Sequence, residues 1–173
     1  GIHKDWLGFT ALNISQDPET LDYMAKSGNF GMLVGIESTN ETVLKKMNKQ
    51  VNLKLGTDSY FDCIQKIHNA GLVVWGSVVF GADGDDKDSF KRMTDFILEN
   101  NIDILTFGIN CPFPKTQLYA RLDSEKRIFR KNYPEDWQYY DTAHVVHRFV
   151  DMTLEDFIEG MQYIYDHIYA GDN

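Results

Sequence analysis

Short apolar runs alternate with segments of helical periodicity over the first 116 residues of this chain. The runs cover residues 6–14, 30–36, 72–80 and 102–110, and the run at 72–80 is continuous enough to predict a strand buried on both faces. Strands that alternate with helices pair in parallel through right-handed crossovers. The pattern therefore predicts an α/β fold, a partial (β/α) TIM-like barrel with about four parallel strands, half the number in a complete barrel.

Helix signals lie between and after these runs. Asp17 followed by Pro18 is typical of a helix start, and Gly28 is typical of a stop. Further helices are expected over residues 41–47, 58–69 and 87–99, whereas residues 48–56 lack an apolar period and predict a loop. After Thr116 we expect a short helix, an extended segment at 145–149, and a last helix opened by a capping box at Thr153. Residues 117–173 are thus expected to form a C-terminal helical extension that packs on the barrel.

Charge and cysteine content limit the functions that the chain can have. A formal net charge of -9 argues against nucleic acid and against an anionic membrane as partners. The sequence contains two cysteines, no signal-peptide pattern and no apolar run long enough to span a bilayer. These features predict a cytoplasmic protein with reduced thiols.

One polar motif follows directly on a predicted buried strand. Gly35-Ile36-Glu37-Ser38 ends the run at 30–36, so Glu37 and Ser38 are expected at the carboxyl end of a parallel strand, where α/β folds bind ligands. A carboxylate there can accept two hydrogen bonds from a ribose diol. The alternative is a glutamate that caps a helix or forms a surface salt bridge.

Two other groups of polar residues indicate ordinary structure. The turn that contains Asp83, Asp85 and Asp86 is too short for an EF-hand and lacks a phosphate-cradling glycine loop, so it predicts a solvated turn. His144 and His147 lie three apart in a segment predicted to be extended, and their side chains are expected on opposite faces. We therefore predict no metal site among these residues.

The ordered set of motifs resembles the second half of a radical S-adenosylmethionine enzyme, of the branch that usually carries an N-terminal cobalamin-binding domain. The resemblance covers nearly the whole chain, and its motifs are Gly28, Gly35-Ile36-Glu37-Ser38, residues 44–49, Gly71, residues 81–85, 112–118, 137–141, 144–146 and 152–153. Lys115 stands where the family usually has a glycine, and the loop backbone is expected to differ there. The resemblance implies that residues 1–116 form the second half of the barrel.

The resemblance also implies a set of cofactor contacts at the strand ends. These are Glu37 and Ser38 toward the ribose, Phe80 and Gly81 beside the adenine, Cys111 and Pro112 along the same pocket, and Asn13 and Ser15 toward the methionine carboxylate or the substrate. The family binds S-adenosylmethionine and a [4Fe-4S] cluster, and cobalamin is possible in this branch. The Cys-x-x-x-Cys-x-x-Cys motif that holds the cluster is absent from these 173 residues.

The resemblance predicts a fragment that is inactive alone. Its partners would be a small-molecule substrate and the missing N-terminal half of the same protein, and the whole enzyme would be an iron-sulfur oxidoreductase or resemble a methyltransferase. The alternative is a self-contained small α/β domain that binds a nucleoside or another small ligand without redox chemistry. An excised half-barrel leaves strand edges unpaired, so a homodimer through exposed sheet edges is a further expectation.

Overall fold

A computed structural model describes residues 4–170 of the chain, and its core is a single parallel sheet. The four strands follow one another in the order β1-β2-β3-β4, and every neighbouring pair is parallel. Their bounds are Trp6–Ala11, Asn29–Glu37, Val73–Phe80 and Ile104–Ile109. The predicted α/β fold with about four parallel strands and flanking helices is therefore confirmed.

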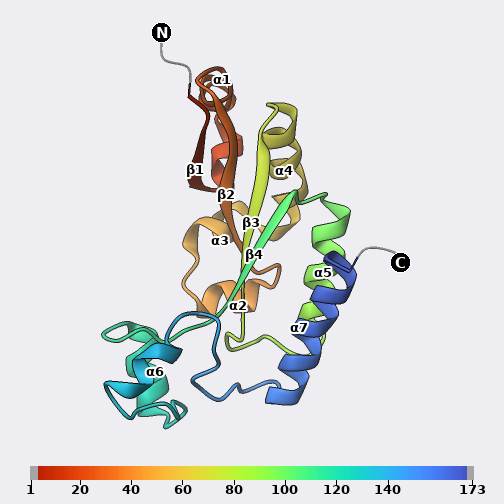
Figure 1. The fold of residues 1–173 in the computed structure, drawn as a ribbon. Helices are drawn as coiled ribbons and strands as arrows, with labels where there is room; N and C mark the ends of the chain where they lie inside the picture. The colour runs from red at the N-terminus through yellow and green to blue at the C-terminus, as the bar shows by residue number, and fades with distance from the viewer. Residues whose placement is uncertain (1–3, 171–173) are drawn as a thin grey trace.

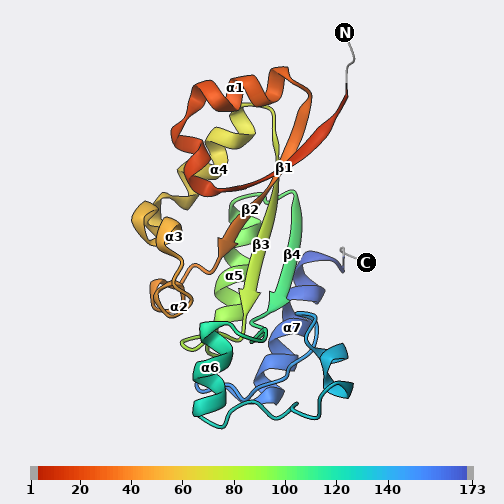
Figure 2. The same ribbon diagram turned by 90° about the vertical axis from the view of Figure 1, so that its left-hand side faces the viewer.

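Helices connect the strands and extend beyond the last one (Figure 1). Their bounds are α1 Pro18–Lys26, α2 Glu41–Lys46, α3 Gln50–Leu55, α4 Tyr60–Asn69, α5 Ser89–Glu99, α6 Gln117–Ser124 and α7 Leu154–Ile168, with 3-10 turns at η1 Leu12–Gln16, η2 Thr57–Ser59 and η3 Glu135–Tyr139. Figure 2 shows α6 beyond the carboxyl ends of β3 and β4, and α7 lies beside α5. The chain thus places its C-terminal segments next to the edge where a ligand is expected.

Local sequence explains where the best-predicted helices begin. The Asp17 carboxylate accepts a hydrogen bond from the Thr20 backbone N–H at 2.9 Å, and Pro18 occupies the first helical position. At α7, Thr153 and Asp156 form the predicted capping box, in which each side chain accepts a hydrogen bond from the other residue's backbone N–H. These signals are local, so the sequence alone is enough to place both helix starts.

Two expected segments are corrected by the structure. Residues 12–14 belong to η1 and not to the first strand. At residues 145–149, by contrast, one isolated bridge between His147 and Ile128 agrees with the expected extended segment. Residues 48–56 contain α3 and are not a loop. Helix α3 is anchored by the buried Asn52 amide, which donates to the Gly35 carbonyl at 3.0 Å and to the Tyr60 hydroxyl at 2.8 Å. This tertiary anchor has no counterpart in the local apolar pattern.

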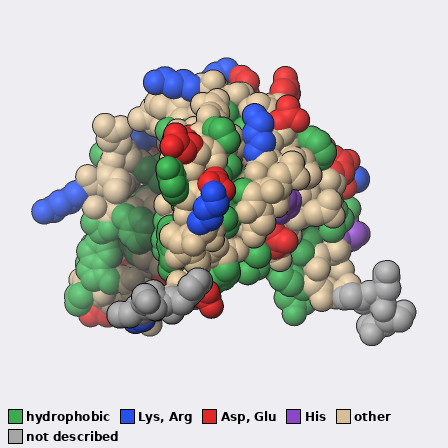
Figure 3. All heavy atoms as spheres, turned by 90° about the horizontal axis from the view of Figure 1, so that it is seen from above, with side chains coloured by type: hydrophobic (Ala, Val, Ile, Leu, Met, Phe, Trp, Pro, Cys, Tyr) green, Lys and Arg blue, Asp and Glu red, His purple; other side chains and the backbone are tan. Residues whose placement is uncertain are grey.

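The two faces of the sheet differ in burial, which corrects the expectation for residues 72–80. Val74, Val78 and Phe80 are buried under the helices, whereas the alternate residues on β3 are only partly buried. On β1, the side chain of Phe9 is 79% exposed. Figure 3 shows hydrophobic side chains at the surface beside a hollow. Helices therefore cover one face of the sheet, and the other face is left largely open.

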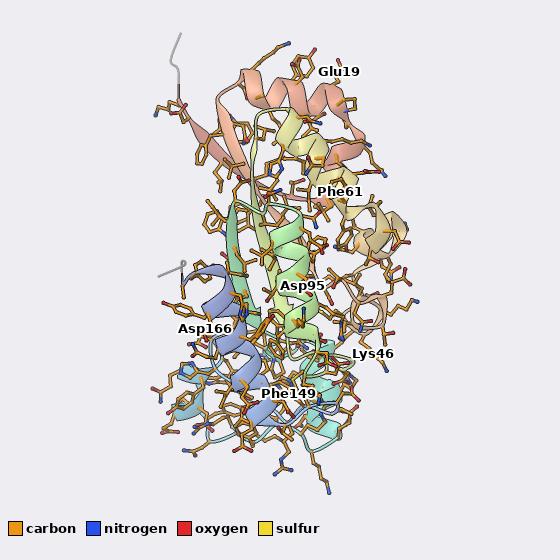
Figure 4. All side chains as sticks on the ribbon, turned by 90° about the vertical axis from the view of Figure 1, so that its right-hand side faces the viewer. Glu19, Lys46, Phe61, Asp95, Phe149 and Asp166 are labelled. Atoms are coloured by element: carbon orange, nitrogen blue, oxygen red, sulfur yellow. The ribbon has the colours of Figure 1, made fainter. Side chains whose placement is uncertain are left out.

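The covered face carries the main core, in which aromatic rings join α5 to α7. Phe90 on α5 stacks on Phe80 with ring centroids 4.7 Å apart and meets Phe157 edge-on at 5.5 Å. Phe149, labelled in Figure 4 near the start of α7, stacks on Phe157 at 4.8 Å. The last helix is thereby tied to the sheet through aromatic packing. Among residues 4–170, no helix has the length and apolar character that crossing a bilayer requires.

The contact between α5 and α7 depends on Gly160, and this predicts the effect of a substitution. A Cβ at Gly160 would overlap the ring of Phe90. Gly160→Ala is therefore expected to lower the free energy of unfolding by about 1–2 kcal/mol, because the overpacking outweighs the gain in helix propensity. Urea denaturation measures this change. Glu159→Ala on the exposed side of α7 is the control, and equal stability of the two variants would contradict the packing argument.

Candidate functional site

A cavity of about 650 Å³ lies at the carboxyl edge of the sheet. One wall is the junction of α2 and α3, at residues 46–49, and another is α6, through Gln117, Leu118 and Arg121. The floor includes the end of β4 and the residues that follow it, Ile109, Asn110 and Cys111. Cavities at this edge are the usual ligand sites of α/β folds, so this cavity is the candidate site.

Glu37 ends β2 beside this cavity in an unusual backbone conformation. Its φ is 65°, a region that non-glycine residues seldom occupy. The carboxylate accepts a hydrogen bond from Lys49 Nζ at 2.6 Å, and Lys49 lines the cavity. A Cβ on Gly35 would lie 2.9 Å from Glu37 Oε1, so glycine at that position lets the carboxylate fold back over the strand. The salt bridge anticipated as the alternative for Glu37 is present, and its contact with ribose stays a prediction.

Lys49 was not singled out from the sequence as a site residue. It lies twelve residues after Glu37, and the α3 helix that it precedes was expected to be a loop. The sequence does hold one signal for Lys49: it is a basic residue separated from the strand-end Glu37 by one short helix. Its ammonium group is a cation on the cavity wall that a carboxylate of a ligand can meet.

The other predicted contacts on β2 and β3 do not point into the cavity. Ser38 is buried, and its hydroxyl accepts a hydrogen bond from the Asn40 backbone N–H at 3.1 Å, which shapes the turn into α2. Phe80 faces the helices and stacks on Phe90. At Gly81, φ is 83° and a Cβ would meet the ring of Phe149. Any ligand contact from these residues would therefore involve the backbone.

The remaining predicted contacts divide between two places. Cys111 lines the cavity, and Pro112 is buried next to it. Burial raises the pKa of the Cys111 thiol, against the effect of a hydrogen bond from the Thr142 backbone. Ser15 instead lines a separate cavity of about 520 Å³ between α1 and α4, and Asn13 is exposed in η1. The structure thus brings Cys111 and Lys49 to one cavity and places Ser15 elsewhere. Glu37 does not line this cavity itself and is joined to it through Lys49.

Positive φ values gather around the candidate cavity. Thr142 lines it with a φ of 67°, and Glu37 beside it has a φ of 65°. Asn48 also lines it, but its φ of 57° is ordinary for an asparagine just after a helix end. Lys115 has a φ of 66°, so the loop keeps the left-handed conformation that suits the glycine expected at that position. Strained backbone of this kind is concentrated at functional sites in proteins. Its distribution here supports the assignment of the cavity.

The turn after β3 is a buried ionic cluster, which corrects the prediction of a solvated turn. The Asp83 carboxylate accepts a hydrogen bond from Arg127 Nη2 at 2.7 Å and a further one from Arg121. Arg127 also donates from Nε to the Arg148 carbonyl at 2.9 Å. Burial opposes ionisation of Asp83, but the two guanidinium groups outweigh it and lower its pKa to about 2. Asp83 and Arg121 both line the cavity, so this cluster forms part of its wall.

Asp85 in the same turn has the opposite electrostatic behaviour. Burial raises its pKa to about 6, although its Oδ2 accepts hydrogen bonds from the Gly81 and Ala82 backbone N–H groups at 3.0 and 3.1 Å. A carboxyl with a raised folded-state pKa favours folding at low pH, and this contribution is lost as the pH rises through about 4 to 6.

Asp85→Asn should therefore change the pH dependence of stability. The amide oxygen can still accept from both backbone N–H groups and carries no charge to desolvate. We expect the variant to be more stable than the wild type by about 2 kcal/mol at pH 8 and nearly equal to it at pH 4. Thermal melts at the two pH values measure the difference. A stabilisation that is the same at both would refute the raised pKa.

No protein-family model matches this chain. The chain is 30% identical over 166 residues to the bacteriochlorophyllide d C-12(1)-methyltransferase of Chlorobaculum tepidum. The matched region covers 96% of this chain and 34% of that protein. The chain is 31% identical over 117 residues to the hopanoid C-2 methylase of Rhodopseudomonas palustris, covering 68% of this chain and 22% of that protein. The chain thus spans about a third or less of the length of these relatives.

Solved structures share the fold. The archaeal Methanocaldococcus infernus Elp3 with an N-terminal deletion matches with a TM-score of 0.67 and 16% identity, over 94% of this chain and 32% of that one. The radical S-adenosylmethionine methyltransferase TsrM from Kitasatospora setae, with cobalamin and a [4Fe-4S] cluster bound, matches with a TM-score of 0.59 and 15% identity, over 68% of this chain and 22% of that one.

A parallel sheet with helices on one face and a cavity of mixed polar and apolar lining beyond its strand ends defines an α/β protein of the open-barrel class. The relatives then support a closer comparison within that class. They confirm the resemblance that the motifs indicated, to part of a radical S-adenosylmethionine enzyme of the cobalamin-associated branch.

Proposed function

We propose that this chain supplies the nucleoside side of the S-adenosylmethionine site in a cobalamin-dependent radical methyltransferase. The observation that carries the proposal is the strand-end pair of Glu37 and Lys49 beside the cavity, with Glu37 Oε1 and Lys49 Nζ 2.6 Å apart. Glu37 would accept hydrogen bonds from the ribose diol, and Lys49 would hold its carboxylate in place or meet the methionine carboxylate. Cys111 and Ile109 would form the apolar side of the pocket.

The cysteines of this chain do not fit a [4Fe-4S] cluster. Cys63 is buried in the core on α4 and Cys111 lies in the cavity, whereas such a cluster is held by four ligands that are mostly thiolates. The cluster would be held by another segment of the longer protein, and when bound it supplies the electron that splits S-adenosylmethionine into methionine and a carbon radical. The residues described here would bind and orient the nucleoside and exclude water. The 173 residues alone are thus expected to be inactive.

We further propose the roles of the two segments and the class of substrate. Residues 1–116 would form the second half of the barrel, and residues 117–173 an extension that closes the cavity through α6 and the Asp83 cluster. By their names, the relatives methylate bacteriochlorophyllide d and hopanoids. A large, mostly apolar ring system is accordingly the substrate class that we propose for the longer protein, with no part for nucleic acid or membrane.

Competition binding tests the proposed site directly. The longer protein that contains this chain would be titrated with S-adenosylmethionine by calorimetry in the absence and presence of adenosine. We expect binding, and adenosine should weaken it in proportion to its concentration because both molecules use the same ribose contacts. Binding that adenosine leaves unaltered would place the nucleoside elsewhere. A protein that binds adenosine and not S-adenosylmethionine would instead support the alternative of a simple nucleoside-binding domain.

Among residues 4–170, β1 has one unpaired edge, and this edge predicts how the isolated chain behaves in solution. β1 pairs with β2 on one side, and Trp6 and Phe9 on this edge strand are 38% and 79% exposed. In the longer protein we propose that the preceding half of the barrel pairs with this edge. The isolated chain should then form homodimers or larger assemblies at micromolar concentration. Light scattering over a range of concentrations checks this, and a constant monomeric mass would exclude it.

A further inference from the structure

We propose that Thr142 is a specificity-determining residue of the candidate cavity, whose hydroxyl forms a hydrogen bond with the adenine end of S-adenosylmethionine. This inference rests on the proposed function and adds a contact from a segment that the sequence did not connect with the cofactor. Thr142 lies 33 positions after Ile109 and three residues after η3, and it lines the cavity.

The backbone of Thr142 is fixed on both sides. Its carbonyl accepts a hydrogen bond from the Ile109 backbone N–H at 2.7 Å, which attaches the loop to the end of β4. The preceding Asp141 carboxylate accepts from the backbone N–H groups of Ala143 at 2.9 Å and His144 at 3.1 Å. These contacts form a local turn that leaves the Thr142 backbone little freedom. The direction of its side chain is thereby determined.

The conformation held in this way is unfavourable for threonine. The φ of Thr142 is 67°, and a branched Cβ is a true outlier in that region, which glycine and asparagine occupy far more easily. The turn by itself would be served equally well by glycine. A β-branched residue held against its own preference points to a task for the side chain.

The side chain lies over the open face of the sheet. A Cβ built on Gly108 would be 3.4 Å from Thr142 Cβ and 3.6 Å from its Oγ1. The Thr142 side chain therefore lies against Gly108, near the carboxyl end of β4. Within residues 4–170, the Thr142 hydroxyl has no hydrogen-bond partner, and Thr142 is exposed. A hydroxyl that is fixed in position, faces a cavity and is free to donate or accept is suited to a polar ligand.

The position of this hydroxyl selects the adenine end of the ligand. Glu37 ends β2 and Thr142 covers β4, two strands away, which corresponds to roughly 10 Å across a parallel sheet. A nucleoside whose ribose is held by Glu37 would extend its base over β3 toward β4. The ring nitrogens and exocyclic amine of adenine offer both acceptors and donors to Thr142 Oγ1.

The test compares three substitutions in the longer protein. Thr142→Val keeps the shape and removes the hydroxyl, and we expect it to weaken S-adenosylmethionine binding by about five- to ten-fold with an unchanged melting temperature. Thr142→Ser keeps the hydroxyl and should bind within about two-fold of the wild type. Thr142→Gly relieves the backbone, so its melting temperature should rise while its affinity falls like that of the valine variant.

The outcomes separate this inference from the function on which it rests. If Thr142→Val binds S-adenosylmethionine as tightly as the wild type, the hydroxyl has no contact with the ligand and the inference is wrong. The inference also fails if Thr142→Ser loses as much affinity as Thr142→Val, because the loss then reflects packing. If the wild-type protein does not bind S-adenosylmethionine, the proposed function fails first.

Discussion

Replacing Asp83 with alanine is expected to lower the free energy of unfolding by about 3 kcal/mol. The Asp83 side chain is 14% exposed and that of Arg127 is 12% exposed, so the substitution would leave a nearly buried guanidinium with only the more exposed Glu125 carboxylate, 2.9 Å from its Nη1, as counter-charge. The same carboxylate also binds Arg121 on α6. Because Arg127 donates to the Arg148 carbonyl as well, the loss is expected to loosen the C-terminal segment from the turn after β3.

The pH dependence of the wild-type free energy of unfolding tests the same cluster in a second way. The pKa of Asp83 is lowered to about 2, so its stabilising contribution is complete above pH 4 and is lost as the pH falls from about 4 to 2. Asp83→Ala should remove this part of the acid transition. Urea denaturation of the wild type and Asp83→Ala at pH 7 and pH 3 measures the difference in their free energies of unfolding. This difference should be larger at pH 7.

A surface carboxylate gives the matched control for Asp83. Asp95 pairs with Lys91 one turn away on α5, and both side chains are largely exposed. Asp95→Ala should therefore cost about 0.5 kcal/mol or less. If Asp83→Ala is no more destabilising than Asp95→Ala, the cluster does not hold the C-terminal segment in the way described.

Replacing Glu37 with glutamine is expected to weaken S-adenosylmethionine binding by the longer protein by about 1–3 kcal/mol. Glutamine has the same shape but offers one acceptor oxygen and no charge, so one hydrogen bond from the ribose diol is lost and the other is weakened. The fold should be nearly unaffected, because Lys49 is 34% exposed and water can replace its contact with the carboxylate. Calorimetric titration of both proteins with S-adenosylmethionine measures the difference.

The control for Glu37 lies four residues further along the chain. Glu41 pairs with Lys45 on the exposed side of α2, at 3.2 Å, and neither of them lines the cavity, whereas Lys49, the partner of Glu37, does. Glu41→Gln is expected to leave the affinity unchanged. Equal affinities for wild type and Glu37→Gln would remove Glu37 from the ribose site and leave its salt bridge with Lys49 as its whole role.

The parts of the fold that follow local rules could be predicted from the sequence. The strand that ends in Glu37 and the helices that begin after Asp17 and Thr153 each carry their signal within a few residues. Helix α3 could not be found in this way, because Asn52 anchors it to Gly35 and Ile36 on another element. The open face of β3 was also missed, since a continuous apolar run does not reveal whether a second layer is present to cover it.

The candidate site was predicted only at its strand ends. Glu37 could be proposed because it ends a strand, and parallel strands bring their carboxyl ends together. Cys111 was proposed through the family resemblance, which places it at the end of the last strand. Asp83 was read as solvated because its partner Arg127 is 44 residues away, and no local pattern joins them. No sequence pattern pointed to Thr142 as a site residue. Its position depends on a left-handed backbone conformation that a threonine in a single sequence does not predict.

Iron and sulfide analysis of the longer protein tests the central claim most directly. The protein would be purified without oxygen and compared with the 173-residue chain prepared in the same way. If this chain is the nucleoside side of a radical S-adenosylmethionine enzyme, the longer protein should contain about four iron and four sulfide per chain, and the 173 residues alone should contain none. A longer protein that contains no iron after anaerobic reconstitution, yet folds and binds nucleoside, would contradict the account.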